Sequence, residues 1–583
     1  MTTTRLLSKV TRRGVALLFP IALAAQAPDA WAPLLRPRTE TPRPTSAGIT
    51  IADLRTRLFQ FADDSMKGRL LDSPGNVKGA EYIAAEAKRL GLEPAGENGT
   101  YFQTVPVVQR TPDPDARLTV NGRAFEAFRD FLPRDMGAGA RPLAGVPSIY
   151  GGIWGDEATM VPAADAAGKL VIIVAQPTDS GGGFAGVPSR VAVLQRFASA
   201  AGIAVIGFDR LPPSQIAFFR STSTGMKDER PVAGPSYLYI TEAVARALLD
   251  ADFAQVKPGT PGRAFANDLA FVETPISNPA RNVVAILRGS DPALKAEYVA
   301  IGAHNDHIGT TRTPVAHDSM YVLNHLFKPA GVESNDPKLE PADAARLNAA
   351  IAEIRRRTHG ASARLDSVFN GADDDGTGSM SVLELAEYFA GQRTRPKRSL
   401  LFVWHVGEEE GMYGSGYFTD HPTVPRAAIV TQLNIDMIGR GGAADQTGTT
   451  KDGKAIRGGP DYLQLVGSRR NSTELGDFVE TVNRSGGHHF TFDYSLDANG
   501  HPQNIYCRSD HYSYARYGIP VVFFTTGGHA DYHQVTDEPQ YIDYAHMLRV
   551  VNLVRDIATR LANLDHRVAF DGPTPDPRGA CRQ

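Results

Sequence analysis

The chain contains the stretch Tyr298-Val299-Ala300-Ile301-Gly302-Ala303-His304-Asn305-Asp306-His307, an apolar run that ends abruptly in two imidazoles and a carboxylate. This pattern is typical of a buried parallel strand that ends at the edge of a sheet, where its polar side chains face a crevice. Histidine and aspartate are side chains that bind zinc or support its ligands. Alone, the pattern is weak evidence for a metal. Its weight depends on whether other strands end in matching groups.

Four further apolar runs have the same character and lie at residues 283–287, 400–404, 429–435 and 520–524. Helical patterns, several of them rich in alanine, separate these runs. Continuous apolar strands that alternate with helices are typical of an α/β fold whose sheet is covered on both faces. The helical stretches count against the alternative, a mainly β sandwich. We therefore expect a mixed, mostly parallel central sheet with helices on both faces.

Length and composition limit the possible functions. The chain has 583 residues, enough for two or three domains, and its 42% hydrophobic content supplies ample material for a core. A formal net charge of −3 argues against a nucleic-acid partner. The two cysteines, Cys507 and Cys581, could pair in an oxidising compartment, which the sequence does not settle. They exclude a thiolate zinc cage, so any metal must be held by His, Asp and Glu.

The first 30 residues have the pattern of a secretory signal peptide. Basic residues precede an apolar segment at 14–25, and small residues follow it. That segment is too short to span a bilayer, and no later stretch reaches the roughly 18 apolar residues that a span requires. We expect an exported protein, periplasmic or secreted, with a flexible leader over 31–47 and no membrane span after signal removal. An uncleaved membrane anchor is the alternative.

Residues 111–265 differ from their surroundings, because they are rich in glycine, proline and short β-type runs. Strand patterns at 168–174 and 202–207 flank a helical pattern at 190–201. We expect this segment to be a small inserted β-rich domain. Residues 48–110 would then begin the main domain, residues 266–565 would complete it, and 566–583 would form a tail. Residues 310–370 interrupt the main domain between two polar motifs and could form a lid.

Polar clusters follow three of the other apolar runs as well, those at 400–404, 429–435 and 520–524. They are His405 with Glu408-Glu409-Glu410, then Asp436, and finally Asp531-Tyr532-His533. A fifth cluster, Asp373-Asp374-Asp375-Gly376-Thr377-Gly378, precedes a helical pattern at 380–389. Open α/β sheets place ligand sites beyond the carboxyl ends of their strands, and adjacent carboxylates repel unless cations neutralise them. Without thiolates, such a set suits two zinc ions about 3.5–4 Å apart that share a bridging carboxylate.

The aspartate cluster also allows a calcium site. Positions 1, 3, 5, 6 and 12 of an EF-hand loop are matched by Asp373, Asp375, Thr377, Gly378 and Glu384. Against this, the second EF-hand that usually accompanies the first is absent, and Pro396 leaves room for only a short exiting helix. A calcium-binding or non-catalytic ectodomain therefore stays open as a hypothesis outside the enzyme class.

In their order, these motifs resemble those of the di-zinc aminopeptidase family, which includes bacterial secreted aminopeptidases, aminopeptidase Y and glutamate carboxypeptidase II. The matching pieces are GAHNDH at 302–307, DDGTG at 374–378, EEEGMYGS at 408–415, DMIG at 436–439 and DYH at 531–533. The segment 111–265 resembles a protease-associated domain, in pattern more than in any diagnostic residue. The chain departs from the family pattern in its insertion after the first motif and in His307, where a small residue is commoner.

The resemblance implies a zinc-binding role for five matching residues. His304 and Asp436 would hold one zinc ion, and Glu409 and His533 would hold the other. Asp374 would bridge both ions. Because both acidic runs contain three carboxylates, a shift of register by one residue within 373–375 or 408–410 stays open.

Catalytic and supporting roles follow from the same resemblance. Glu408 would be the general base that takes a proton from the metal-bound water, and Asp306 would accept a hydrogen bond from His304. Tyr532 could donate to the developing oxyanion and Arg508 could contact the substrate, with a structural hydrogen bond as the alternative for each. Structural or supporting roles are expected for Cys507, His307, His405 and His511.

The sequence thus predicts an exported di-zinc exopeptidase, most simply an aminopeptidase that removes N-terminal residues from peptides. A carboxypeptidase-like member of the same family is the alternative, because Arg508 or Arg440 could grip a C-terminal carboxylate. No motif indicates which N-terminal residues are preferred or whether the chain forms oligomers.

Overall fold

The computed structural model describes residues 31–583 except 135–139, 157, 159, 176–192, 194–195, 212, 228–233, 253, 359–362, 574–575, 580 and 582. The expected signal peptide and part of the expected helix at 190–201 lie outside the described residues. Within the described ranges, no helix is both long and apolar enough to cross a membrane.

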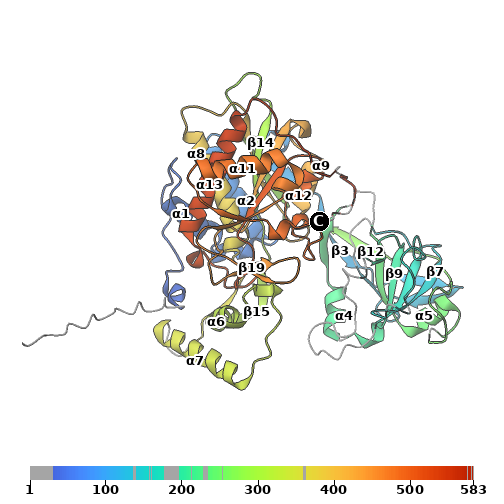
Figure 1. Cartoon of the computed structure of the whole chain (residues 1–583). Helices are drawn as coiled ribbons and strands as arrows, with labels where there is room; N and C mark the ends of the chain where they lie inside the picture. Colours follow the sequence, from blue (N-terminus) through green and yellow to red (C-terminus); the bar gives the residue numbers. More distant parts are fainter. Residues whose placement is uncertain are drawn as a thin grey trace, which may run out of the picture.

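The main body is built on a nine-stranded mixed sheet with the order β1-β13-β17-β14-β18-β23-β21-β22, and β2 also pairs with β13. Figure 1 labels β14 of this sheet within the main body. The strands are β1 (Glu93–Pro94), β2 (Phe102–Thr104), β13 (Arg281–Leu287), β14 (Tyr298–His304), β17 (Ser399–His405), β18 (Ile429–Ile435), β21 (Tyr462–Val466), β22 (Thr491–Asp493) and β23 (Val521–Thr525). The central strands β17, β14, β18 and β23 are parallel, whereas β13 and β21 run antiparallel to them. The expected mixed sheet is confirmed, with its parallel pairing concentrated at the centre.

Helices cover both faces of this sheet. One face packs against α1 (Ile51–Phe61), α2 (Pro74–Arg89), α8 (Gly378–Gly391), α11 (Thr473–Ser485) and α13 (Tyr544–Asn563), and the other against α9 (Tyr413–Asp420) and α12 (His511–Ala515). The strands alternate accordingly: Phe402 of β17 packs in one core, and Leu401 and Val403 pack in the other. Both faces of the central strands are therefore apolar, which explains their continuous hydrophobic runs.

Local sequence signals set the helix starts. The side chain of Thr50 accepts a hydrogen bond from the backbone N–H of Asp53 at the start of α1. Ser73 caps α2 in the same way, and Pro74 occupies its first position. Such caps satisfy N–H groups that have no partner inside the helix, so they fix where the chain enters each helix.

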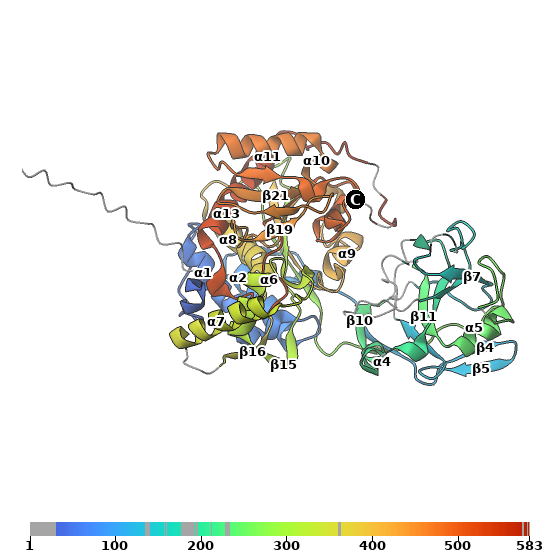
Figure 2. The same ribbon diagram turned by 60° about the horizontal axis from the view of Figure 1, so that its bottom comes forward.

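A second unit has a five-stranded sheet of its own, with the order β6-β11-β9-β8-β7. It comprises β6 (Phe131–Arg134), β7 (Ser148–Ile153), β8 (Leu170–Val174), β9 (Gly202–Ile206), β11 (Ser236–Ile240), the hairpin β4 (Arg117–Val120) and β5 (Arg123–Glu126), α4 (Pro213–Arg220) and α5 (Glu242–Leu249). Figure 2 shows it to one side of the main body. A three-stranded ribbon of β10 (Ser223–Met226), β3 (Val107–Pro112) and β12 (Phe271–Pro275) includes both chain connections between the units.

The segment 310–370 forms an excursion from the main body. It contains β15 (Thr310–Ala316), α6 (His317–Phe327), the turn η5 (Gly331–Glu333), α7 (Pro341–Thr358) and β16 (Leu365–Val368), so the helix expected at 341–357 is present. The buried carboxylate of Glu538 anchors this segment, because it lies 3.0 Å from His317 Nε2 and pairs with Arg364.

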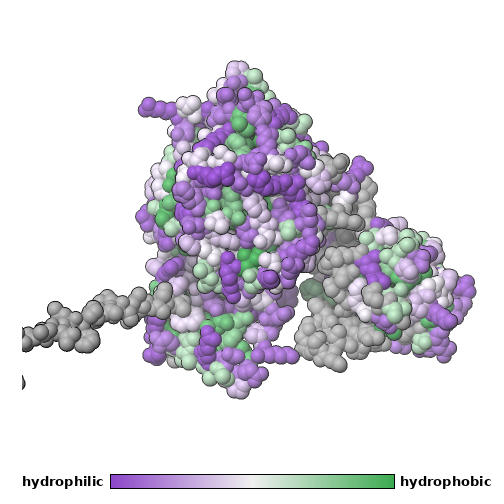
Figure 3. All heavy atoms as spheres, in the orientation of Figure 1, coloured by the Kyte–Doolittle hydropathy of each residue, from purple (hydrophilic) through white to green (hydrophobic). Residues whose placement is uncertain are grey.

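The face of the molecule in Figure 3 is mainly hydrophilic, as a core sealed inside the sheet layers requires.

A small two-stranded element and one covalent link complete the carboxyl-terminal half. The element pairs β19 (Gln446–Thr449) with β20 (Ala455–Arg457), and the short helix α10 (Ser468–Asn471) precedes α11. Cys507 and Cys581 form a disulfide across 74 residues, which ties the tail to the main body.

Candidate metal centre

The carboxyl ends of the central parallel strands meet at one edge of the main sheet. His304 is the last residue of β14, and Asp436 directly follows β18. Glu408 and Glu409 lie in the turn after β17, and His533 lies in the loop after β23. Because these strands are adjacent and parallel, the loops that follow them converge on one site.

Asp374 joins the two histidines. It lies in η6 (Ala372–Thr377), directly before α8. Its Oδ1 atom lies 3.2 Å from His304 Nε2, and its Oδ2 atom lies 2.9 Å from His533 Nε2. One carboxylate thus faces two imidazoles with different oxygens, which is the arrangement of a ligand that bridges two metal ions.

The two neighbouring aspartates have other partners. Asp375 accepts hydrogen bonds from the backbone N–H groups of His304, Gly378 and Met437, at 3.1, 2.9 and 3.3 Å. Asp373 accepts from the hydroxyl of Thr377 and the N–H of Gly439. Asp375 does lie near His304 and Asp436, with ligand atoms all within 4.8 Å. Its oxygens are already engaged by backbone donors, however, so Asp374 is the better ligand.

The EF-hand positions do not converge. The carboxylate of Glu384, at position 12 of that motif, lies 3.0 Å from the Nε atom of the buried Arg57. This arginine neutralises Glu384. The oxygens of Asp375 accept hydrogen bonds from backbone N–H groups, so the two carboxylates do not face a common cation. The structure gives no support to a calcium loop here.

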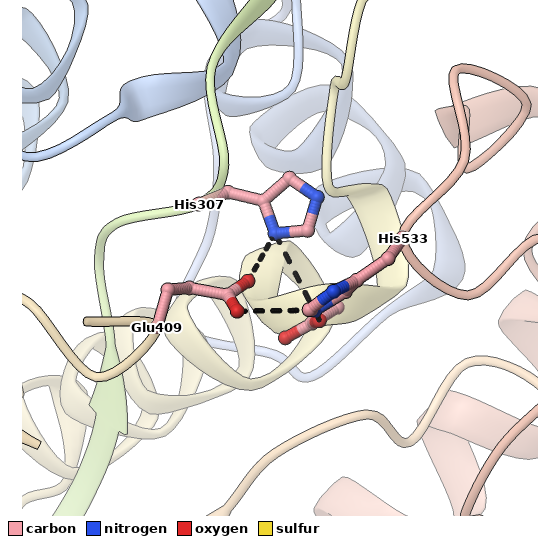
Figure 4. Close-up of side chains that lie close together, drawn as sticks. His307, Glu409 and His533 are labelled. Carbon is pink, nitrogen blue, oxygen red and sulfur yellow. Dashed lines mark hydrogen bonds and ion pairs between the residues drawn. The ribbon is translucent and has the colours of Figure 1, made fainter. Parts of the chain in front are cut away.

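Glu408 and Glu409 differ in their contacts. Glu409 Oε2 lies 3.0 Å from His533 Nε2, and its Oε1 lies 2.6 Å from His307 Nδ1 (Figure 4). Glu408 Oε2 lies 4.0 Å from His304 Nε2, and its carboxylate has no hydrogen-bond partner in the described part of the chain. Glu410 is exposed. Glu409 therefore contacts both imidazoles, whereas the Glu408 carboxylate is free beside it.

Asp306 organises the turn that carries these glutamates. Its carboxylate accepts hydrogen bonds from the backbone N–H groups of Glu408 and Glu409, at 3.1 and 3.3 Å. The same carboxylate lies 3.7 Å from His304 Nδ1, whereas the main-chain oxygen of Asp306 is closer, at 3.3 Å. Asp306 therefore contacts both the first and the third motif.

Unpartnered buried atoms show that the site fits metal ions. Asp436 Oδ2 accepts from the Ser509 hydroxyl at 2.7 Å, but its Oδ1 has no hydrogen-bond partner among the described residues. Asp436 Oδ1 lies 3.7 Å from His304 Nε2. Buried polar atoms normally have partners, and a cation held between Asp436, His304 and Asp374 would provide one.

The charge balance points the same way. In the ranges that the structure describes, no lysine or arginine forms an ion pair with Asp374, Glu408, Glu409 or Asp436, and histidines are their ion-pair partners. A third group of possible ligands, formed by His317, Asp366 and Glu538, is different. Arg364 pairs with both of its carboxylates, so that group is already neutralised.

Side chains of this site have strongly shifted pKa values. Burial raises the pKa of Glu408 well above its usual range, and the charges of Asp436 and Glu409 raise it further. Burial alone would lower the pKa of His533, but hydrogen bonds to Asp374 and Glu409 raise it to about 11. The negative potential is thus strong enough to hold a proton on an imidazole, where divalent cations could bind instead.

Two residues with predicted substrate roles contact the 310–370 segment. The carbonyl oxygen of Tyr532 accepts a hydrogen bond from the N–H of Val332 at 3.1 Å. Arg508 Nη1 lies 2.9 Å from Glu333 Oε1. The η5 turn therefore lies against the loop that carries His533.

His307 is a member of the site that the sequence reasoning missed. It is fully buried, and its Nδ1 lies 3.8 Å from Asp374 Oδ2 as well as close to Glu409. Together with His533, these residues offer four ligand atoms that all lie within 4.8 Å of one another. The available signal was two histidines in one motif, three residues apart.

Fold and site together define a class of protein. Histidines and carboxylates at the carboxyl edge of a central parallel sheet, arranged around one aspartate that faces two imidazoles, are typical of a metal-dependent hydrolase. Residues 351–558 match the model of Peptidase family M28. The matched segment contains Asp374, Glu408, Glu409, Asp436 and His533.

Relatives share shorter stretches. The chain is 38% identical over 84 residues to a vacuolar membrane protease of Sclerotinia sclerotiorum, covering 14% of this chain and 8% of that one. It is 29% identical over 201 residues to leucine aminopeptidase 1 of Coccidioides posadasii, covering 33% and 47%. The chain spans less than half the length of either relative. Among solved structures, an aminopeptidase from Aneurinibacillus sp. strain AM-1 matches with 14% identity, a TM-score of 0.44 and coverage of 91% and 98%.

Proposed function

We propose that this chain is an exported aminopeptidase that uses two zinc ions to hydrolyse N-terminal residues from peptides. The observation that carries the proposal is the position of Asp374, whose two oxygens face His304 and His533 at 3.2 and 2.9 Å. A single bridging carboxylate between two nitrogen ligands is what a pair of zinc ions requires. The similarity to a leucine aminopeptidase supports cleavage at the N-terminal end of the peptide substrate.

The residues divide into two zinc-binding sets. His304 and Asp436 would hold one ion, Glu409 and His533 would hold the other, and Asp374 would contact both. When bound, zinc lowers the pKa of water and polarises a carbonyl group, which are the two requirements for peptide hydrolysis at neutral pH.

Glu408 is the candidate proton carrier. Its carboxylate lies beside His304 and makes no hydrogen bond within the described residues, so it is free to accept a proton from the attacking water. Transfer of that proton to the leaving amine would complete the reaction. The hydrogen bonds from the turn to Asp306 hold Glu408 in this position. The hydroxyl of Tyr532 is the candidate donor to the developing oxyanion.

The arginines that could grip a C-terminal carboxylate already have partners. Arg508 pairs with Glu333. The buried Arg440 lies 2.9 Å from Asp531 Oδ2. These ion pairs favour the aminopeptidase over the carboxypeptidase-like alternative, because a substrate carboxylate would have to displace an existing acidic partner.

Export and the second unit are further parts of the proposal. The disulfide between Cys507 and Cys581 suits an oxidising compartment outside the cytosol, periplasmic or extracellular. The five-stranded unit would act as a protease-associated domain that docks or gates peptides, since none of its described residues is a candidate ligand.

The experiment uses aminoacyl arylamides with free and N-acetylated termini, before and after chelation, with zinc counted per chain. We expect turnover of the free substrates only, loss of turnover on chelation, and two zinc ions per chain. Equal turnover of acetylated substrates would refute the aminopeptidase assignment. Turnover that survives complete removal of zinc would refute the metal assignment.

A further inference from the structure

We infer that His307 is an additional ligand of the zinc ion held by Glu409 and His533. That ion would then have four protein ligands, including Asp374, whereas the ion held by His304 and Asp436 would have three. The inference rests on the proposed two-zinc site. It adds a difference in the number of protein ligands between the two ions, which the sequence motifs alone do not indicate.

The distances around His307 suit a shared ion. Zinc bonds of about 2.0–2.1 Å in a tetrahedron separate the ligand atoms by roughly 3.3 Å. His307 Nδ1 lies 2.6 Å from Glu409 Oε1 and 3.8 Å from Asp374 Oδ2, on either side of this value. His533 Nε2 lies 3.0 and 2.9 Å from the same two carboxylates. Both imidazoles thus face the same pair of acids, and the four ligand atoms all lie within 4.8 Å of one another.

The direction of the His307 ring supports a role at the site. Its Nε2 atom is buried and has no hydrogen-bond partner among the described residues, so its polar contacts are all made through Nδ1. The ring is perpendicular to that of His533, with centroids 5.4 Å apart, and Figure 4 shows both rings directed toward Glu409. Two imidazoles in this relation present their nitrogens to a common point without stacking.

The opposite side of the ring is closely packed. A Cβ atom on Gly371 would lie 2.5 Å from His307 Cγ, and Gly371 has φ of 56°. Only glycine suits both this backbone conformation and the close approach of the imidazole. The loop before Asp374 is therefore shaped around the ring, which limits its movement away from Glu409.

The asymmetry has a chemical consequence. Zinc with four protein ligands is typical of closed sites, whereas zinc with three keeps a position for water or substrate. The ion bound by His304, Asp374 and Asp436 would therefore be the one that keeps an open position. The free carboxylate of Glu408 lies on that side, 4.0 Å from His304 Nε2. The His307 ion would mainly hold the bridging aspartate in place.

A crystal structure of the zinc-loaded full chain, with anomalous scattering at the zinc edge, tests the inference directly. We expect one zinc about 2.0–2.1 Å from His307 Nδ1. Two bound ions with His307 Nδ1 left on Glu409 alone would overturn this inference and leave the proposed function intact. A zinc-saturated chain with no ion at Asp374 would overturn both.

Two variants test the same point in solution by competition with a chelator. His307→Asn keeps a side-chain donor that can hydrogen bond to Glu409 but removes the imidazole ligand, and His307→Ala removes both. We expect both variants to lower the affinity for one of the two zinc ions by more than about 100-fold, because loss of a residue that only supports a ligand lowers metal affinity by about 10–100-fold. Wild-type affinity in the His307→Asn chain would show that His307 only orients Glu409. Thermal unfolding of each zinc-free variant checks that the fold is intact.

Discussion

Replacement of Glu408 by glutamine should lower turnover by several orders of magnitude without releasing zinc. The Glu408 carboxylate makes no hydrogen bond within the described residues and lies 4.0 Å from His304 Nε2, so glutamine breaks no structural contact. It removes only the proton acceptor. General base catalysis contributes about 10²–10⁴-fold, or roughly 3–5 kcal/mol of transition-state stabilisation, and kcat should fall by that factor with KM little changed.

The adjacent glutamate should behave in the opposite way. Glu409 faces His533 at 3.0 Å and His307 at 2.6 Å, so Glu409→Gln removes a ligand charge from between two imidazoles. We expect zinc affinity to fall by at least about 10–100-fold, the cost of an even milder change around a metal. Activity should return in part when zinc is added in excess, which Glu408→Gln should not show.

The assay measures kcat and KM on a leucyl arylamide together with zinc per chain after dialysis. Glu410→Gln is the matched control from the same acidic run, because Glu410 is exposed and such changes usually shift stability by less than about 0.5 kcal/mol. Zinc loss in Glu408→Gln, or full zinc with no turnover in Glu409→Gln, would mean that the two roles are exchanged. Loss of activity in Glu410→Gln would refute the register altogether.

Three further predictions test the surroundings of the site. Asp306→Asn places an amide against backbone N–H donors, so chelator competition should show zinc affinity lowered by about 10–100-fold; unchanged affinity would remove Asp306 from the site. Burial lowers the pKa of His511 to about 3. As the pH falls from 6.5 toward 3, this histidine therefore lowers the free energy of unfolding by about 1.4 kcal/mol per pH unit. In urea unfolding of the zinc-free chain, the free energy of unfolding should fall between pH 7 and pH 5 by about 2 kcal/mol less in His511→Phe than in wild type; parallel pH profiles of the two proteins would contradict the lowered pKa. Joint replacement of Cys507 and Cys581 by serine opens a 74-residue loop, and denaturant unfolding should show a loss of about 4 kcal/mol; an unchanged midpoint would exclude a stabilising disulfide.

The ends of the central strands were predictable because both signals are local. The run from Tyr298 to Ala303 is apolar at every position, and the polar residues begin where β14 ends, at His304. The same change occurs at the end of β18, before Asp436. Burial of a strand on both faces and exposure of its carboxyl end leave this signature in consecutive residues, so no long-range information is needed.

Contacts made by the inserted segments could not be predicted. Glu333 meets Arg508 across 175 positions of sequence, and nothing in either local pattern indicates the pairing. The direction of the His307 ring was equally hidden, because it depends on the close approach of Gly371, which is 64 positions later in the chain. Both depend on how loops pack after the sheet has formed.

Carboxylates of identical chemistry are the residues whose roles the sequence distinguishes least. Asp375 and Asp306 have their oxygens engaged by backbone N–H groups, so they join loops and hold the ligand-bearing turns in register. Asp374 and Glu409 instead face imidazoles without a cationic side chain, which is the environment that a metal ion completes. Adjacent residues in one acidic run therefore have opposite roles, and the backbone decides which is which. In the run 373–375, the aspartate that binds backbone N–H groups places its neighbour between the two histidines, so the structural carboxylate positions the one proposed to bridge the ions.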